Sequence, residues 1–132
     1  MKKILNQHFK KQSFTARWLP VFLWASVIFF FSSLPQQKVS ETFISDFVIK
    51  KIAHISEYAI LYLLTFKATG RNFTQSYIFV IFYAALDEIH QAFVPGRTPK
   101  VYDVLGFDLT GANISAFILW KLQLTRPSKP KK

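Results

Sequence analysis

The chain has 132 residues, enough for one domain, and 51% of them are apolar and 17% aromatic. Its 17 Lys and Arg outnumber 7 Asp and Glu, giving a net charge of +10. Most of these cations lie at the chain ends or between apolar stretches, which argues against a soluble nucleic-acid-binding protein and is typical of charges that flank membrane spans. There is no Cys, which excludes a disulfide framework and a thiolate metal site.

The first predicted element is an apolar helix from Trp18 to Leu34, which follows a polar, basic segment over residues 1–17. A bilayer core about 30 Å thick needs roughly 20 residues of helix, so this segment predicts a membrane span. A cleaved secretory signal peptide is the alternative. The long basic segment, the length of the apolar run and the lack of a small-residue cleavage site before Pro35 favour an uncleaved span.

Three further spans are predicted, at about residues 51–68, 73–93 and 102–122. The polar residues 35–47 predict a loop, with room for a short surface helix. The third span ends at Pro95 and Gly96, because Pro lacks a backbone donor and Gly permits the turn. The predicted fold class is therefore all-α: an integral membrane four-helix bundle over residues 18–122, between the basic segment 1–17 and a basic disordered tail over residues 123–132.

The distribution of cations predicts the orientation of these spans. If both termini are cytoplasmic, 12 Lys and Arg lie inside, and the five outside are Lys38, Lys50, Lys51, Arg97 and Lys100. The positive-inside rule favours this arrangement, and the short loops are the regime in which it holds. We therefore predict a multi-pass protein of the bacterial cytoplasmic (inner) membrane.

Polar residues recur inside three of the predicted spans, where charges are costly and mark candidate sites. In the second span they share one face through i, i+3 and i+4 spacing, and the same spacing recurs in the third. Alternating span directions bring these groups and the acids that open the fourth span to one end of the bundle, which faces outward if the termini are inside. The candidate polar pocket consists of Lys51, His54, Glu57, Tyr58, Asp87, Glu88, His90, Gln91, Arg97, Asp103 and Asp108.

Several chemistries are open to this group. It could form a binding pocket, or it could only pin the helices together. Arg97 could bind a phosphate or carboxylate through two parallel bonds, or it could pair with Asp87 or Asp103. A weaker alternative is a metal held by His54, Glu57, Asp87 and His90 through nitrogen and oxygen donors. No cofactor is predicted, and no catalytic residue can be named.

Two stretches resemble the VanZ-like family. KIAHISEYAILYLL, from Lys51 to Leu64, is similar to its Lys-x-x-His-x-x-Glu-Tyr motif. DEIHQAFVPGRTPKVYDVLGFDLTGA, from Asp87 to Ala112, is similar to its second signature, Asp-Glu-x-x-Gln-x-Phe-x-Pro-Gly-Arg followed by an Asp and a Gly-containing helix. FFFSSLP, from Phe29 to Pro35, resembles the end of the family's first helix. The resemblance covers about residues 18–120 and implies a small bacterial membrane protein of a family named for a teicoplanin-resistance protein.

Three functions remain open. The leading hypothesis is a protein that binds or remodels a cell-envelope component at the outward polar pocket: a lipid headgroup, a cell-wall precursor or a glycopeptide-type antibiotic. The second is a membrane enzyme that acts on a lipid-linked phosphate by acid–base chemistry of His, Glu and Asp, which is disfavoured by the lack of a nucleophile motif. The third is a small transporter. For each of these functions we expect membrane lipid as a partner and no nucleic acid. A homo-oligomer is also compatible with a bundle of four short helices.

Overall fold

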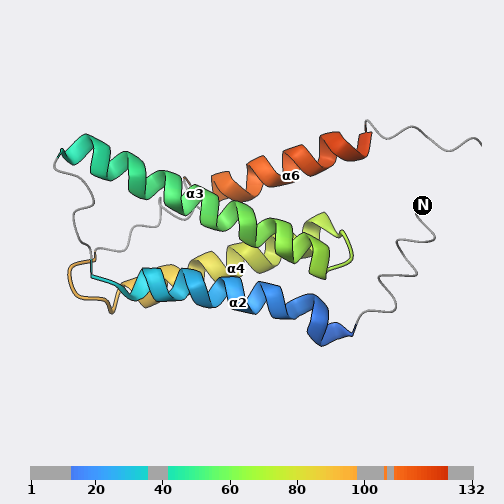
Figure 1. Cartoon of the computed structure of the whole chain (residues 1–132), viewed down its shortest axis with the longest axis horizontal. Coiled ribbons are helices and arrows are strands. Elements are labelled where there is room, and N and C mark those ends of the chain that lie inside the picture. The colour runs from blue at the N-terminus through green and yellow to red at the C-terminus, as the bar shows by residue number, and fades with distance from the viewer. Residues whose placement is uncertain (1–12, 36–41, 98–105, 107–108, 125–132) are drawn as a thin grey trace, which may run out of the picture.

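The computed structural model describes residues 13–35, 42–97, 106 and 109–124. Within these ranges the chain forms four helices and no strand: α2 (Phe14–Ser33), α3 (Phe43–Ala68), α4 (Phe73–Gln91) and α6 (Leu109–Leu124). Successive helices run in opposite directions, so α2 and α4 point one way and α3 and α6 the other (Figure 1). The predicted all-α class is confirmed for this part of the chain.

Helix α3 lies at the centre of the molecule. It packs against α2, α4 and α6, and its contact with α6 is the most extensive. In Figure 1, α6 lies along the side of α3 away from α2. The core is therefore organised around α3, whose buried side chains include Tyr58, Leu61 and Tyr62.

Helix α2 buries one narrow stripe. Val21, Ala25, Ile28 and Ser32 are its buried residues, spaced at i, i+4, i+7 and i+11. This spacing places all four on one helix face. Large apolar residues occupy the remaining faces, and Phe22, Leu23 and Phe30 are each more than half exposed.

The second helix begins earlier than predicted. It starts at Phe43 rather than near residue 51, so residues 43–47 belong to α3 and not to a loop. Asp46 lies in the first turn, where a carboxylate stabilises the positive end of the helix dipole, and it accepts a hydrogen bond from Lys50 at 2.7 Å one turn later. These local interactions extend the helix through a segment whose polar residues kept it out of the predicted membrane span.

A tight turn connects α3 and α4. Gly70 and Arg71 have φ of 73° and 70°. The Arg71 N–H donates to the Phe66 carbonyl at 2.8 Å and the Gly70 N–H to the Lys67 carbonyl at 3.4 Å. This is the Schellman pattern, which satisfies carbonyls that the end of a helix leaves unpaired. The Asn72 side chain then caps α4 by accepting from the Gln75 N–H at 3.0 Å.

Helices α3 and α6 approach very closely at Gly111. A Cβ atom at this position would overlap the Ile55 carbonyl oxygen and lie 2.8 Å from the Ala59 nitrogen. Ala112 is fully buried beside it, and Ser115 donates to the Ala59 carbonyl at 3.1 Å. Small residues such as these let two helix backbones touch.

The other helix boundaries lie near their predicted positions. Helix α2 begins at Phe14, α4 ends at Gln91 and α6 ends at Leu124. Among the described residues one helix, α2, is long and apolar enough to cross a membrane by length and composition. The predicted start of the fourth helix at residue 102 lies outside the described residues.

Candidate functional site

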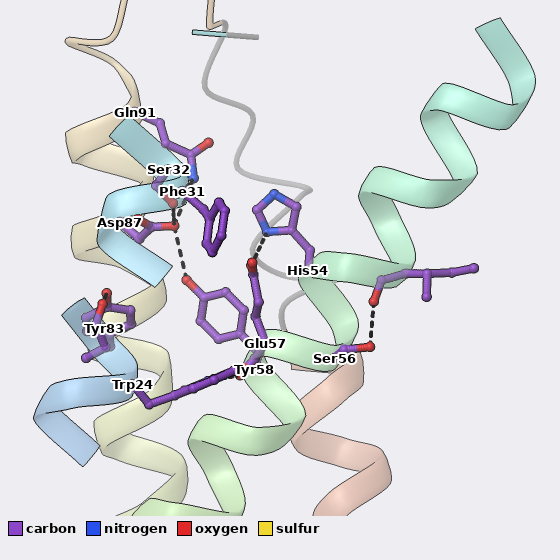
Figure 2. Close-up of polar contacts among 12 residues, drawn as sticks. Trp24, Phe31, Ser32, His54, Ser56, Glu57, Tyr58, Tyr83, Asp87 and Gln91 are labelled. Carbon is purple, nitrogen blue, oxygen red and sulfur yellow. Dashed lines mark hydrogen bonds and ion pairs between the residues drawn. The ribbon is translucent and has the colours of Figure 1, made fainter. Parts of the chain in front are cut away.

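Asp87 is the centre of the polar contacts. It lies one turn before the end of α4 and is only 3% exposed. Its Oδ2 atom accepts hydrogen bonds from Ser32 Oγ at 2.9 Å, Gln91 Nε2 at 2.8 Å and Tyr58 OH at 3.3 Å. The donors come from α2, α4 and α3, so one carboxylate oxygen joins three helices (Figure 2).

The second oxygen of Asp87 differs from the first. Oδ1 is buried and has no hydrogen-bond partner among the described residues. Leaving a buried acceptor unsatisfied costs about 1 to 3 kcal/mol, more for a charged group. The arrangement therefore presents a buried acceptor whose partner is not one of the described side chains.

The second helix contributes a separate pair beside this carboxylate. His54 Nδ1 lies 3.8 Å from Glu57 Oε2, one turn along α3. Both side chains are partly exposed, at 26% and 20%. Trp24 fixes this part of α3, because its indole N–H donates to the Glu57 carbonyl at 2.9 Å. In Figure 2 the pair and Tyr58 project from the same side of α3.

His90 faces α2 instead of α3. Its Nε2 lies 2.9 Å from Ser33 Oγ, and its ring stacks on Phe29 with centroids 4.1 Å apart. The i, i+3 spacing of Asp87 and His90 thus gives both residues contacts with α2, through Ser32 and Ser33 respectively. His90 serves as a second polar link between α2 and α4.

Among the described residues, Arg97 binds the end of a helix. Its Nη2 donates to the Phe31 carbonyl at 3.1 Å and its Nε to the Leu34 carbonyl at 3.3 Å. The preceding Pro95 and Gly96 form a turn closed by the Arg97 N–H on the Val94 carbonyl at 3.1 Å, with Gly96 at φ 80°. The guanidinium therefore lies at the negative end of the α2 dipole. The alternative of a salt bridge to Asp87 is wrong, since these two described residues form no ion pair.

The remaining predicted residues are more scattered. Lys51 lies 5.5 Å from the centre of the Phe47 ring, and Glu88 is partly exposed on α4. Asp103 and Asp108 lie outside the described residues. No group of three His, Asp or Glu side chains is arranged to hold a metal within the described ranges, and His54, Glu57, Asp87 and His90 are not gathered there into one set of ligands.

The sequence interpretation left Ser32 and Ser33 out of the candidate residues, although both contact them. Ser32 continues the buried stripe of α2, four residues after Ile28. Two adjacent hydroxyls at the end of an otherwise apolar helix are the signal that could have identified them. The polar cluster is therefore defined here as Ser32, Ser33, His54, Glu57, Tyr58, Asp87, His90 and Gln91.

Comparison with known proteins supports the resemblance seen in the motifs. No curated protein and no solved structure matches the chain. The family model described as VanZ/LLP1 matches residues 14–124, which include all four described helices and every residue of the polar cluster. The match spans most of the 132 residues, and the chain belongs to the VanZ/LLP1 family.

Proposed function

We propose that this VanZ/LLP1 protein is a four-span membrane protein that binds an amphiphilic component of the cell envelope at its polar cluster. The observation that carries the proposal is the half-satisfied carboxylate of Asp87. A carboxylate that only held helices together would gain most by pairing both of its oxygens. Keeping Oδ1 buried and unpaired among the described groups suits an acceptor that waits for a donor from a ligand.

The surface of the bundle supports insertion in a membrane. Large apolar side chains are exposed on all four helices, among them Phe30 on α2, Ile52 on α3, Phe82 on α4 and Phe117 on α6. Soluble proteins rarely expose apolar surface so widely. With 20 residues α2 is about 30 Å long, which matches the hydrocarbon thickness, and α4 with 19 residues is nearly as long.

The position of the polar cluster supports an amphiphilic ligand. Asp87, His90 and Gln91 lie in the last two turns of α4, and Ser32 and Ser33 end α2. These ends meet at one end of the molecule (Figure 1). A ligand with a polar head and an apolar tail would place its head beside the cluster and its tail along the exposed apolar faces. Phospholipids, lipid-linked cell-wall precursors and lipoglycopeptides have this form.

The test is ligand-dependent stabilisation of the full-length protein in detergent. A ligand that binds only the folded state raises the melting temperature. The panel contains a phospholipid, a polyprenyl phosphate, teicoplanin and divalent cations. We expect one amphiphile to raise the melting temperature of the wild type and of Asp46→Asn, but not of Asp87→Asn.

Asp46→Asn is the matched control, because it makes the same substitution in α3 away from the polar cluster. If no amphiphile stabilises the wild type, or if Asp87→Asn responds as strongly as the wild type, the proposed binding function is wrong. If the wild type turned over the polyprenyl phosphate and Glu57→Gln abolished this turnover, the result would instead favour the alternative of a membrane enzyme.

A further inference from the structure

The end of the molecule opposite the polar cluster is strongly basic. Arg17 near the start of α2, Lys67 and Arg71 at the end of α3, and Lys121 near the end of α6 lie there (Figure 1). Of the acidic residues in the described part of the chain, Asp46 lies in the first turn of α3, Asp87 and Glu88 lie near the end of α4, and Glu57 lies near the middle of α3. This end therefore has a positive potential without a described carboxylate to offset it.

A pocket opens between the final turns of α3 and α6 at this basic end. Its volume is about 270 Å³. Lys67, Arg71 and Gln123 provide its polar groups, and Leu63, Leu119 and Leu122 line much of the rest. Leu63 and Leu122 are 43% and 54% exposed, so the apolar wall continues onto the outer surface of the helices.

The two cations of the pocket are available for a ligand. The carbonyls of Phe66 and Lys67 already accept from the backbone of Arg71 and Gly70, so the end of α3 does not need these side chains as caps. Neither the Lys67 ammonium nor the Arg71 guanidinium has an ion pair or side-chain hydrogen bond within the described ranges. Left-handed φ at Arg71 sets its side chain just beyond the last turn of α3.

We propose that this pocket binds an anionic phospholipid, with the phosphate between Lys67 and Arg71 and an acyl chain along Leu63, Leu119 and Leu122. An ammonium and a guanidinium together match a phosphate, which Arg binds through parallel hydrogen bonds. A free phosphate ion would leave the leucine wall unused, whereas a lipid uses both halves of the pocket. Basic pockets between membrane helices on the cytoplasmic side have this composition.

The lipid site goes beyond the proposed function. It lies at the other end of the molecule and shares no residue with the polar cluster. It relies on insertion of the bundle in a membrane but not on any ligand of Asp87. The two sites can therefore be tested separately, and failure at one leaves the other standing.

The experiment measures the affinity of full-length protein in neutral detergent for dioctanoyl phosphatidylglycerol and dioctanoyl phosphatidylcholine by isothermal titration calorimetry. The acyl chains are identical, so the comparison isolates the headgroup charge. We expect phosphatidylglycerol to bind at least fivefold more tightly. Lys67→Gln and Arg71→Gln should each weaken that affinity about fivefold, as for the loss of one basic residue near an anionic lipid.

Lys121→Gln is the matched control, because it removes one positive charge from the same end of the bundle but outside the pocket. Its affinity should stay within twofold of the wild type. Leu122→Ser should weaken binding of both lipids, and glycerophosphoglycerol, the headgroup without acyl chains, should not compete. Equal affinity for the two lipids, an equal loss in Lys121→Gln, or effective competition by the headgroup alone would each overturn the lipid site.

Discussion

Two tyrosines of α3, one turn apart, have opposite hydrogen-bonding environments. Tyr58 and Tyr62 are both fully buried. The Tyr58 hydroxyl donates to Asp87 Oδ2 at 3.3 Å, whereas the Tyr62 hydroxyl has no hydrogen-bond partner among the described residues. The same substitution at the two positions therefore separates a hydrogen-bonded hydroxyl from an unsatisfied one.

We expect Tyr58→Phe to lower the free energy of unfolding by about 0.5 to 1.5 kcal/mol, because Asp87 loses one of its three donors. Tyr62→Phe should be neutral or stabilising, since it removes a polar group that gains no bond on burial. Denaturation in detergent, followed by tryptophan fluorescence, measures both. Equal destabilisation of the two variants would show that the bond to Asp87 contributes nothing.

At the residue scale, the sequence predicted which side chains share a helix face better than it predicted which groups those side chains contact. The i, i+3 and i+4 spacing identified His54, Glu57 and Tyr58 as one face of a helix, and the structure agrees. It did not show that Arg97 would bind the α2 carbonyls, because that contact depends on the direction of the Pro95–Gly96 turn. Backbone carbonyls are present at every residue, so composition carries no signal for them.

At the scale of elements, the crossing of α3 and α6 depends on the absence of a side chain at Gly111. Ala has a higher helix propensity than Gly by roughly 1 kcal/mol, so Gly→Ala at an open helical position is stabilising or neutral. At Gly111 the added Cβ would overlap the Ile55 carbonyl oxygen. The helices would have to separate, which would also break the bond from Ser115 to Ala59.

Gly111→Ala should therefore destabilise the protein by about 2 kcal/mol or more, in the range of overpacked cores. Gly106→Ala is the matched control, because nothing lies within 4 Å of a Cβ at that position. Thermal unfolding of the two variants should differ clearly, with Gly106→Ala close to the wild type. A Gly111→Ala protein as stable as the wild type would mean that α6 does not pack against α3 as described.

Apolar runs located the helices, but the start of α3 shows where this signal fails. Residues 43–50 contain Ser45, Asp46 and Lys50, which interrupt the apolar run. The predicted start was therefore placed too late, at residue 51. The helix continues because Asp46 and Lys50 pair along its surface. Hydropathy measures transfer into lipid, whereas helix formation also depends on such local pairs. The predicted start of the span and the observed start of the helix therefore differ.

For the whole molecule, alternation of helix directions was enough to predict that the polar residues of α3 and α4 meet at one end. The inclusion of α2 through Ser32 and Ser33 was not predicted, because the rotation of a helix about its axis depends on packing. That rotation is set here by the stripe of Val21, Ala25 and Ile28. Topology was therefore accessible from the sequence, and the exact membership of the cluster was not.

The proposed insertion makes a prediction about the two ends of the bundle. Ser13 and Thr74 are exposed at the basic end, and Thr42 and Ala92 are exposed at the polar end. Since the chain contains no Cys, a single introduced Cys provides a unique label at each position. By the positive-inside rule, the excess of cations predicts that the basic end faces the cytoplasm.

In intact bacterial cells, a membrane-impermeant maleimide should label Thr42→Cys and Ala92→Cys. Ser13→Cys and Thr74→Cys should react only after the membrane is permeabilised. The reverse pattern would keep four spans but invert the orientation, which would place the polar cluster in the cytoplasm and remove direct access to an external ligand. Labelling of Thr42→Cys and Thr74→Cys from the same side would contradict the span of α3, because these positions flank it at opposite ends.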